Sequence, residues 1–385
     1  MEFINGRAYK KEELLSSGKY KVLRVGNFFT NNSWYYSNLE LTEDKYCYKG
    51  DLLYAWSASF GPKIWDGDKT IFHYHIWNVK YNHSVATRDY LFYFLLYDKN
   101  QISKSTTGST MVHVSMENMK PRFIPLPPLK EQQRIVAEIE HWFTLINQIE
   151  QGKAELQTSI KQAKSKILDL AIHGKLVSQD PNDEPASELL KRINPKAEIT
   201  CDNGQYGKLP KGWCRCQFGE YLDVRDGTHD SPKYVEKGYP FVTSKNLNYG
   251  KIDFDTAKFI SEEDYIKYSQ RSLVEDGDIL FAMIGSIGNP VLIVKDREFS
   301  IKNVALFKSY DRKNTYMEYV LYYLLYIQET LKQNAKGGMQ PFIPLNYFRK
   351  DLYIPLPPIE EQHRIVTKIE ELFSLLDNIQ KALEV

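Results

Sequence analysis

The feature that most constrains this chain is an internal repeat. The stretch IPLPPLKEQQRIV at 124–136 recurs as IPLPPIEEQHRIV at 354–366, an offset of 354 − 124 = 230. Weaker echoes extend the match: the segment 50–55 parallels 277–282, and Gly108 parallels Gly338 at the same offset. Self-similarity at a fixed offset indicates repeated structural units. We therefore expect two domains of one fold, each followed by a helix.

Two proline pairs mark where those helices begin. Pro127-Pro128 and Pro357-Pro358 disfavour a helix before them and suit a helix start just after. Apolar residues then follow in alternating steps of four and three from Ile135 to Leu170, with one polar interruption at Lys153, and again from Ile365 to Leu383. Such heptad spacing is typical of a coiled coil, and Gly174 supplies a stop for the first helix.

These boundaries predict tandem α/β (α+β) domains separated by long helices that form an antiparallel coiled coil. The expected parts are a first domain at 1–128, a helix at 129–173, a connector at 174–207, a second domain at 208–358 and a closing helix at 359–385. The first domain is short at its amino end, because the segment Leu209–Asp223 of the second has no counterpart before Gly6.

Composition excludes several classes of protein. The longest apolar runs are far shorter than the roughly 20 residues of a membrane span, and the first residues do not form a secretory signal, so we expect a cytoplasmic protein. The net charge of +1 means that any nucleic-acid role depends on local clusters of basic residues. The sequence contains no phosphate-binding loop and no His-Glu-x-x-His motif, so we expect no catalytic centre.

Metal sites are also not expected. The four cysteines are too few to indicate a disulfide framework and are interpreted as reduced thiols. We expect Cys214 and Cys216 to point to opposite faces of a strand, and the same for His73 and His75, so neither pair is interpreted as a zinc site.

The repeated PLPPL-x-EQ-x-RIV pattern resembles the conserved regions of Type I restriction-modification specificity subunits, and the segment 167–193 is similar to the stretch that follows their central helix. This resemblance implies two target recognition domains, each reading half of a split site in double-stranded DNA, with the helix pair holding them apart. From the length of the coil and the rise of the duplex, we expect the half-sites to be separated by roughly one to two turns. The resemblance also implies adenine methyltransferase and restriction endonuclease subunits as partners. S-adenosylmethionine, ATP and Mg²⁺ are then expected on those partners, with no cofactor on this chain. The alternative is a coiled-coil interaction module whose twin domains bind proteins or glycans.

Candidate DNA contacts are polar and basic residues in loops, because Arg, Lys, Asn, Gln, Ser and Thr read base edges and glycine turns suit phosphates. Two second-domain segments, Asp-Gly-Thr-His at 226–229 and Ser-Lys-Asn at 244–246, also resemble segments of the family's domains. For Gly108 and Gly338 a tight turn without DNA contact is the alternative. The candidates are Arg24, Asn27, Ser57, Lys104, Ser105, Thr106, Thr107, Gly108, Ser109, Thr110 and His113 in the first domain, and Arg225, Thr228, His229, Lys233, Ser244, Lys245, Asn246, Ser286, Lys336, Gly338 and Gln340 in the second.

Partner binding is predicted on the helices. Arg134 and Arg364 occupy the same position of the repeat, so we expect a partner that meets one copy to meet the other in equivalent geometry. Solvation of these exposed helix faces is the alternative.

Overall fold

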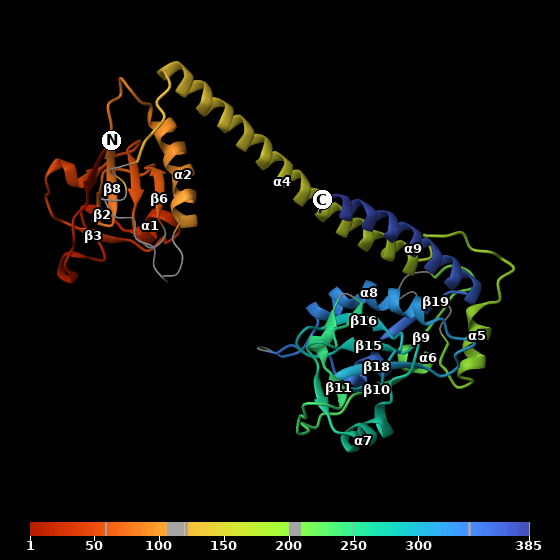
Figure 1. Ribbon diagram of the computed structural model, residues 1–385. Coiled ribbons are helices and arrows are strands. Elements are labelled where there is room, and N and C mark those ends of the chain that lie inside the picture. The colour runs from red at the N-terminus through yellow and green to blue at the C-terminus, as the bar shows by residue number, and fades with distance from the viewer. Residues whose placement is uncertain are drawn as a thin grey trace. The chain divides into compact units, whose positions relative to one another are not determined.

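The computed structural model divides into two compact units, Met1–Gln151 and Gly152–Val385 (Figure 1). It describes residues 1–57, 60–105, 119, 122–199, 209–248, 250–337 and 340–384, and the side chains of 100–105 are not among the described atoms.

The first unit is built on two four-stranded sheets. One has the order β1-β8-β5-β6, and the other has the order β3-β2-β7-β4. Successive side chains of β5 point to opposite faces of the sheet, as in any strand. Leu52 and Tyr54 therefore pack into one hydrophobic core, and Leu53 and Ala55 pack into another. Its elements are β1 (Glu2–Asn5), a 3-10 helix (Lys11–Glu13), β2 (Tyr20–Leu23), α1 (Val25–Phe29), β3 (Tyr35–Ser37), a 3-10 helix (Glu43–Lys45), β4 (Tyr46–Cys47), β5 (Leu52–Ala55), β6 (Gly61–Ile64), β7 (Thr70–Phe72), β8 (Ile76–Lys80) and α2 (Arg88–Ser105).

The second unit repeats this plan and adds to it. Its main sheet has the order β10-β18-β15-β16, a smaller one has the order β14-β11-β17, and β12-β13 and β19-β9 form two-stranded pairs. Its elements are α5 (Ala186–Ile193), β9 (Cys214–Gln217), α6 (Phe218–Tyr221), β10 (Leu222–Asp226), β11 (Tyr239–Val242), η3 (Ser244–Asn246), β12 (Leu247–Asn248), β13 (Lys251–Ile252), β14 (Lys258–Ile260), α7 (Glu262–Ser272), β15 (Ile279–Ala282), β16 (Gly288–Leu292), β17 (Ser300–Ile301), β18 (Val304–Ser309), α8 (Met317–Gln333), η4 (Tyr347–Asp351) and β19 (Tyr353–Leu356).

The predicted repeat of the fold is confirmed in the order and direction of the strands. β2 runs parallel to β7 in the first unit, and β11 runs parallel to β17 in the second. Gly6 and Gly227 occupy the same place beside these strands. A Cβ atom added to either would lie 2.3 Å from a backbone oxygen, that of Phe72 or of Ile301. Only glycine permits so close an approach of two backbones.

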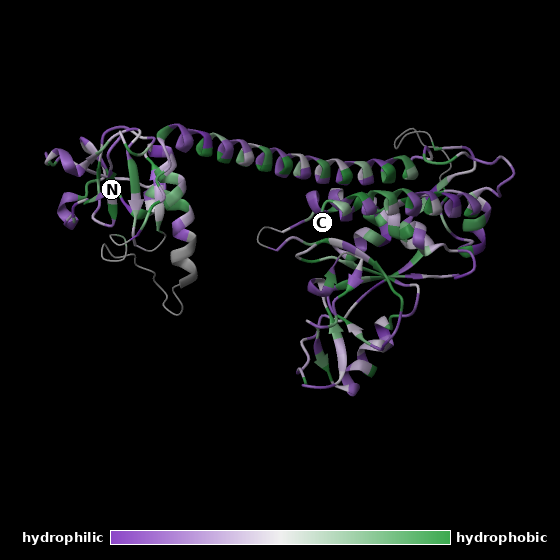
Figure 2. Ribbon diagram, turned by 45° about the horizontal axis from the view of Figure 1, so that its top comes forward, coloured by the Kyte–Doolittle hydropathy of each residue, from purple (hydrophilic) through white to green (hydrophobic). Residues whose placement is uncertain are grey.

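The two predicted helices begin where the proline pairs placed them. α4 (Leu129–Ile172) and α9 (Ile359–Ala382) both start directly after their proline pair, and Gly174, with φ 63°, follows the end of α4. Hydrophobic and hydrophilic residues alternate along α4 (Figure 2). α9 lies antiparallel to the half of α4 that belongs to the second unit, where Lys164 pairs with Asp377.

Side chains of the two helices differ in burial along their length. Ile365, Val366 and Ile369 of α9 are buried in the second core, and Leu168 and Ile172 of α4 enter the same core. The first half of α4 carries exposed apolar side chains instead, at Trp142, Phe143, Ile146 and Ile149. The segment after α4 also joins the second core, through Ala186 and Leu190 of α5.

The prediction that the paired cysteines and histidines point to opposite faces is wrong. Residues two apart in a strand share a face, and Cys214 and Cys216 are both fully buried on the inner face of β9. The rings of His73 and His75 likewise lie together, with 4.8 Å between their centroids. Among the described residues, no three His, Cys, Asp or Glu side chains are grouped as metal ligands.

None of the described helices combines the length and the apolar character that crossing a bilayer requires.

Candidate nucleic-acid interface

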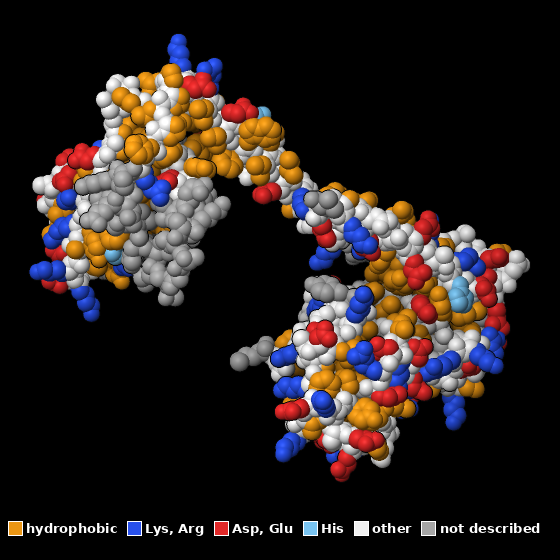
Figure 3. Space-filling model, in the orientation of Figure 1, with side chains coloured by type: hydrophobic (Ala, Val, Ile, Leu, Met, Phe, Trp, Pro, Cys, Tyr) orange, Lys and Arg blue, Asp and Glu red, His pale blue; other side chains and the backbone are white. Residues whose placement is uncertain are grey.

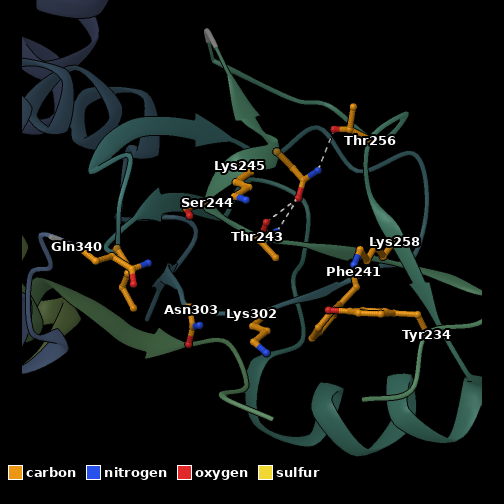
Figure 4. Close-up of a pocket in the computed structure, with 12 residues that line it drawn as sticks. Tyr234, Phe241, Thr243, Ser244, Lys245, Thr256, Lys258, Lys302, Asn303 and Gln340 are labelled. Atoms are coloured by element: carbon orange, nitrogen blue, oxygen red, sulfur yellow. Dashed lines mark hydrogen bonds between the residues drawn. The ribbon is translucent and has the colours of Figure 1, made fainter. Parts of the chain in front are cut away.

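A basic cavity opens in the second unit, at the ends of strands β11 and β17. Its volume is about 360 Å³. Four of the predicted DNA-binding residues line it: Ser244, Lys245, Asn246 and Gln340. Figure 4 shows Tyr234, Phe241 and Lys258 on one side of this cavity and Gln340 on the other. The full lining is Tyr234, Phe241, Thr243, Ser244, Lys245, Asn246, Thr256, Lys258, Ile284, Lys302, Asn303 and Gln340.

The charge of the cavity is positive. Lys245, Lys258 and Lys302 belong to its lining, and none of the described lining residues is acidic. The Nζ atom of Lys258 lies 4.3 Å from the centroid of the Tyr234 ring, a cation–π contact that orients the amine. Lys302 Nζ donates to Ser231 Oγ at 2.7 Å. Three amines beside hydroxyl and amide groups suit a phosphate backbone or the edges of bases.

Asn246 shapes the cavity from inside the protein. Only 4% of the residue is exposed. Its Oδ1 atom accepts from the backbone N–H of Thr243 at 2.9 Å, and its Nδ2 atom donates to the carbonyl of Asp253 at 3.2 Å. These bonds hold η3 against the loop after β13. Asn246 therefore positions its neighbours Ser244 and Lys245 at the rim of the cavity.

A charged cluster adjoins the cavity at Asn303. This residue has φ 54°, a left-handed backbone that is uncommon outside glycine. Its Oδ1 atom lies 2.6 Å from His229 Nδ1, and His229 Nε2 lies 3.0 Å from Asp226 Oδ2. Asp226 also pairs with Arg271. The predicted residue His229 is thus fixed between the loop 226–230 and the Lys302–Asn303 turn.

Four further predicted residues of the second unit are described and lie outside the cavity lining: Arg225, Thr228, Lys233 and Ser286. Arg225 is held within the chain, since its Nε donates to Asp223 Oδ2 at 2.7 Å. Thr228 is nearly buried and accepts from the backbone N–H of Asp230 at 3.1 Å. Lys233 and Ser286 are exposed on loops.

Lys336 lies at the base of its loop, opposite Phe342. Lys336 exchanges two backbone hydrogen bonds with Phe342, of 3.0 and 2.7 Å. Gly337, next to Lys336, has a left-handed backbone with φ 98°. Gly338 lies outside the described residues.

In the first unit, two predicted residues lie at the equivalent place. β2 corresponds to β11 by its pairing, so Arg24 and Asn27 hold the places of Thr243 and Asn246. The Arg24 guanidinium lies 4.9 Å above the Tyr35 ring. Asn27 Nδ2 donates to the carbonyls of Asn31 and Ser33, at 3.0 and 2.7 Å, as Asn246 braces its own loop.

The other first-unit predictions fare differently. Ser57 is buried, with 5% exposed, so it is not the exposed loop residue that we expected, and its contact with DNA stays a prediction. Lys104 and Ser105 lie in the last turn of α2 rather than in a loop. The predicted residues Thr106, Thr107, Gly108, Ser109, Thr110 and His113 lie outside the described residues.

Sequence reasoning missed part of this interface. Tyr234, Lys258, Lys302 and Asn303 line the cavity but were not predicted. Lys258 lies in β14, and Lys302 and Asn303 directly follow β17, so these three do not stand in long polar loops. In the first unit His73 stands where Lys302 stands in the second, since it bridges Arg7 as Lys302 bridges Thr228. Burial lowers the pKa of His73 to about 4, with the charges of His75 and Arg24 adding to the effect.

The two arginines that are predicted to bind a partner have different contacts within this chain, and partner binding at either of them stays a prediction. Arg364 Nη2 lies 2.6 Å from Asp183 Oδ2, and this hydrogen bond raises the pKa of Arg364. Arg134 is 76% exposed, and among the described residues its ion-pair partner is Glu131 on its own helix. The two arginines share a position in the repeat but not a partner.

Comparison with known proteins gives one consistent result. The family model for the Type I restriction modification DNA specificity domain matches residues 1–158 and 211–385. The Type I restriction enzyme EcoBI specificity subunit of Escherichia coli is 24% identical over 387 residues, which span 98% of this chain and 78% of that protein.

Two solved structures share the fold. A chain from a structure of the complex assembly and conformational transition of the type I R-M system aligns with a TM-score of 0.64 and 20% identity, covering 88% of this chain and 78% of that one. The HsdS subunit from Thermoanaerobacter tengcongensis aligns with a TM-score of 0.53 and 20% identity, covering 88% and 76%. These matches give no support to the alternative of an interaction module without a DNA role.

Proposed function

We infer that this chain, which belongs to the Type I restriction modification DNA specificity family, supplies the sequence specificity of a Type I restriction-modification complex. Each of its two domains reads one half of a split target in double-stranded DNA. The helices α4 and α9 set the distance between the two half-sites.

The observation that carries this proposal is the lysine-lined cavity of the second unit. It gathers Lys245, Lys258 and Lys302 beside Ser244 and Gln340, a combination that supplies cations for phosphates and neutral donors for base edges. The corresponding place in the first unit carries Arg24, Asn27 and His73 instead. Two domains that recognise different DNA sequences need the same fold with different side chains at equivalent positions.

We further propose that the chain is not itself an enzyme. Its partners are adenine methyltransferase subunits, which bind S-adenosylmethionine, and a restriction endonuclease subunit, which uses ATP and Mg²⁺. The chain itself binds no cofactor. Exposed helix positions such as Arg134 serve the contact with these partners, whereas Arg364 serves its own fold through Asp183.

The test is a map of N6-methyladenine in the DNA of cells that carry this gene together with the genes of its partner subunits. A split motif, with two short specific halves and a fixed gap, is the expected result. A second strain carries a chain in which Lys245, Lys258 and Lys302 are all glutamine. Loss of methylation at the split motif in this strain is expected, and an unchanged map there would contradict the role of the cavity.

A further inference from the structure

Positive charge alone does not identify the group that reads DNA sequence in the cavity of the second unit. Lysine and arginine side chains lie among aspartate and glutamate over the face of this unit that Figure 3 shows. Lysine amines also bind phosphates, which are the same in every DNA sequence. Neutral amides and hydroxyls pair with particular base edges, so they are better candidates for sequence recognition. Those in the cavity lining, besides Tyr234, belong to Thr243, Ser244, Asn246, Thr256, Asn303 and Gln340.

Three of these side chains hold the loops of the protein itself. Thr243 Oγ1 donates to Asn246 Oδ1 at 2.9 Å, and Thr256 Oγ1 donates to Asp253 Oδ2 at 2.8 Å. The amide of Asn246 is bonded at both of its ends and is nearly buried. These polar atoms are therefore used inside the fold. The candidates that remain for contact with a base are Ser244, Asn303 and Gln340.

The amide of Asn303 is held at its oxygen end by another side chain. Its Oδ1 atom lies 2.6 Å from His229 Nδ1, and His229 is not among the residues that line the cavity. No described residue accepts a hydrogen bond from the Nδ2 atom at the other end of the amide. An amide nitrogen carries two N–H donors. Asn303, which Figure 4 shows in the wall of the cavity, therefore keeps its acceptor for His229 and has its donors free.

The ring of His229 is fixed from its other side by Asp226. His229 Nε2 lies 3.0 Å from Asp226 Oδ2. The Asp226 side chain is only 7% exposed and also pairs with Arg271, so it is a firm support for the ring. With an oxygen atom facing each ring nitrogen, His229 in its protonated form donates to both. Asp226 thus holds the ring, and the ring holds the oxygen of Asn303.

The backbone of Asn303 has a conformation that few side chains adopt. Its φ of 54° is left-handed, and Asn289, with φ 50°, is the other non-glycine residue of the described chain with a positive φ. Asparagine tolerates this region better than most residues, but the conformation still costs energy, and such positions concentrate at functional sites. In the second unit the unusual backbone and the anchored amide coincide at one residue of the cavity lining.

The first unit builds the equivalent turn without either side chain. Tyr74 takes the place of Asn303, one residue after the matched bridges of the two units, and Ala8 takes the place of His229. The backbone N–H of Tyr74 donates across its turn at 3.1 Å, and that of Asn303 does so at 3.3 Å. The fold therefore does not require His229 and Asn303 at these positions, which points to a role beyond the structure of the turn.

We propose, on the premise of the function proposed above, that Asn303 determines specificity at one base of the second half-site. Its amide N–H groups donate to an acceptor atom on the edge of that base, such as a purine N7, guanine O6 or thymine O4. His229 is a positioning residue that fixes the amide with its nitrogen, and not its oxygen, toward the base. A donor that is already held in place discriminates well, because its rotation does not have to be arrested on binding.

The test uses complexes of the full chain with its methyltransferase subunits. Methylation rates are measured on the target duplex found in the N6-methyladenine map, and on duplexes with single base-pair changes at each specific position of both half-sites. Asn303→Gly removes the amide but keeps a residue that adopts the left-handed backbone without steric cost. Asn303→Asp keeps an oxygen for His229 but removes the N–H donors. His229→Ala leaves the amide of Asn303 free to rotate.

We expect Asn303→Gly and Asn303→Asp to lower discrimination at one and the same base pair of the second half-site by about tenfold. Discrimination in the first half-site should stay unchanged. His229→Ala should relax the same base pair, and it should have no further effect in the Asn303→Gly background, because the two residues act through one contact. A purely structural role of His229 would not confine its effect to that base pair. Asn289→Gly, at the other left-handed asparagine and outside the cavity lining, is the matched control and should change no position.

Four results would overturn the proposal. These are unchanged discrimination in Asn303→Gly, equal weakening at every position of both half-sites in that variant, a retained preference in Asn303→Asp, and relaxation of a different base pair by His229→Ala. A failure of the proposed function itself is distinguishable, because the unsubstituted complex would then methylate no split motif, and the role of Asn303 would be lost with it.

Discussion

Arg364 of α9 donates two hydrogen bonds to Asp183 in the segment that follows α4. The distances are 2.6 Å from Nη2 to Oδ2 and 3.4 Å from Nη1 to Oδ1. The Asp183 side chain is only 8% exposed, whereas that of Arg364 is 36% exposed. The contact ties the closing helix to a segment 364 − 183 = 181 residues earlier. It makes the segment after α4 part of the second unit's structure.

Substitution of Arg364 should therefore destabilise the second unit. Arg364→Ala leaves the nearly buried Asp183 carboxylate without its partner, and such losses are costly. Because Arg364 is itself partly exposed to water, we expect a decrease of about 1–3 kcal/mol in the free energy of unfolding, measured by urea denaturation. Arg134→Ala, at the same repeat position, is the control and should cost less than about 0.5 kcal/mol. Equal losses in both variants would refute the asymmetry.

Glu361 should make the stability of the second unit depend on pH. Burial raises the pKa of Glu361 above its ordinary value of 4.5, although Trp213 and Gln179 donate to the carboxylate. The unfolded chain then loses this proton at a lower pH than the folded chain. The contribution of Glu361 to stability is thus fully present below pH 4.5 and is lost as the pH rises through the folded pKa.

The matched variants are Glu361→Gln and Glu360→Gln. The first keeps an acceptor for Trp213 but removes the ionisation, so we expect it to flatten the decline in urea midpoint as the pH is raised from about 4.5. Glu360 is exposed, and its substitution should leave the profile unchanged. A Glu361→Gln profile that follows the unsubstituted chain would rule out this source of pH dependence.

The sequence was sufficient for the elements that depend on local pattern. The proline pairs and the heptad spacing predicted the first residue of both α4 and α9 correctly, and the internal repeat predicted two domains of one fold. Contacts between distant segments carry no such pattern. Lys258 and Lys302 reach the same cavity from β14 and from the turn after β17, and only the pairing of both strands with β11 brings them together. The sequence also did not indicate that Ser57 is buried, because a single serine after a strand is equally compatible with a core position and with an exposed loop.

The cavity lysines should contribute to DNA binding through phosphates. Lys302→Gln and Lys258→Gln, tested in the complex with the methyltransferase subunits, should each weaken binding to any duplex. Each lost phosphate contact should also reduce the slope of log K against log salt by about 0.9. Lys191→Gln on α5, outside the cavity lining, is the control. Weaker binding without a change in salt slope would point away from phosphate contact, and unchanged binding would remove both lysines from the interface.

The length of α4 should determine the spacing between the two half-sites. Seven residues inserted after Gln148 add one heptad to the exposed part of the helix and leave intact the half of α4 that packs with α9. At 1.5 Å per residue the helix grows by about 10 Å, which corresponds to at most about three base pairs of 3.4 Å. The insertion keeps the apolar face nearly in line, since seven residues at 3.6 per turn are close to two full turns.

We expect the N6-methyladenine map to show the same two half-sites with a longer gap. An insertion of two residues turns the face by about 200° and should abolish methylation instead. If the heptad insertion left the gap as it was, α4 would not be the element that sets it.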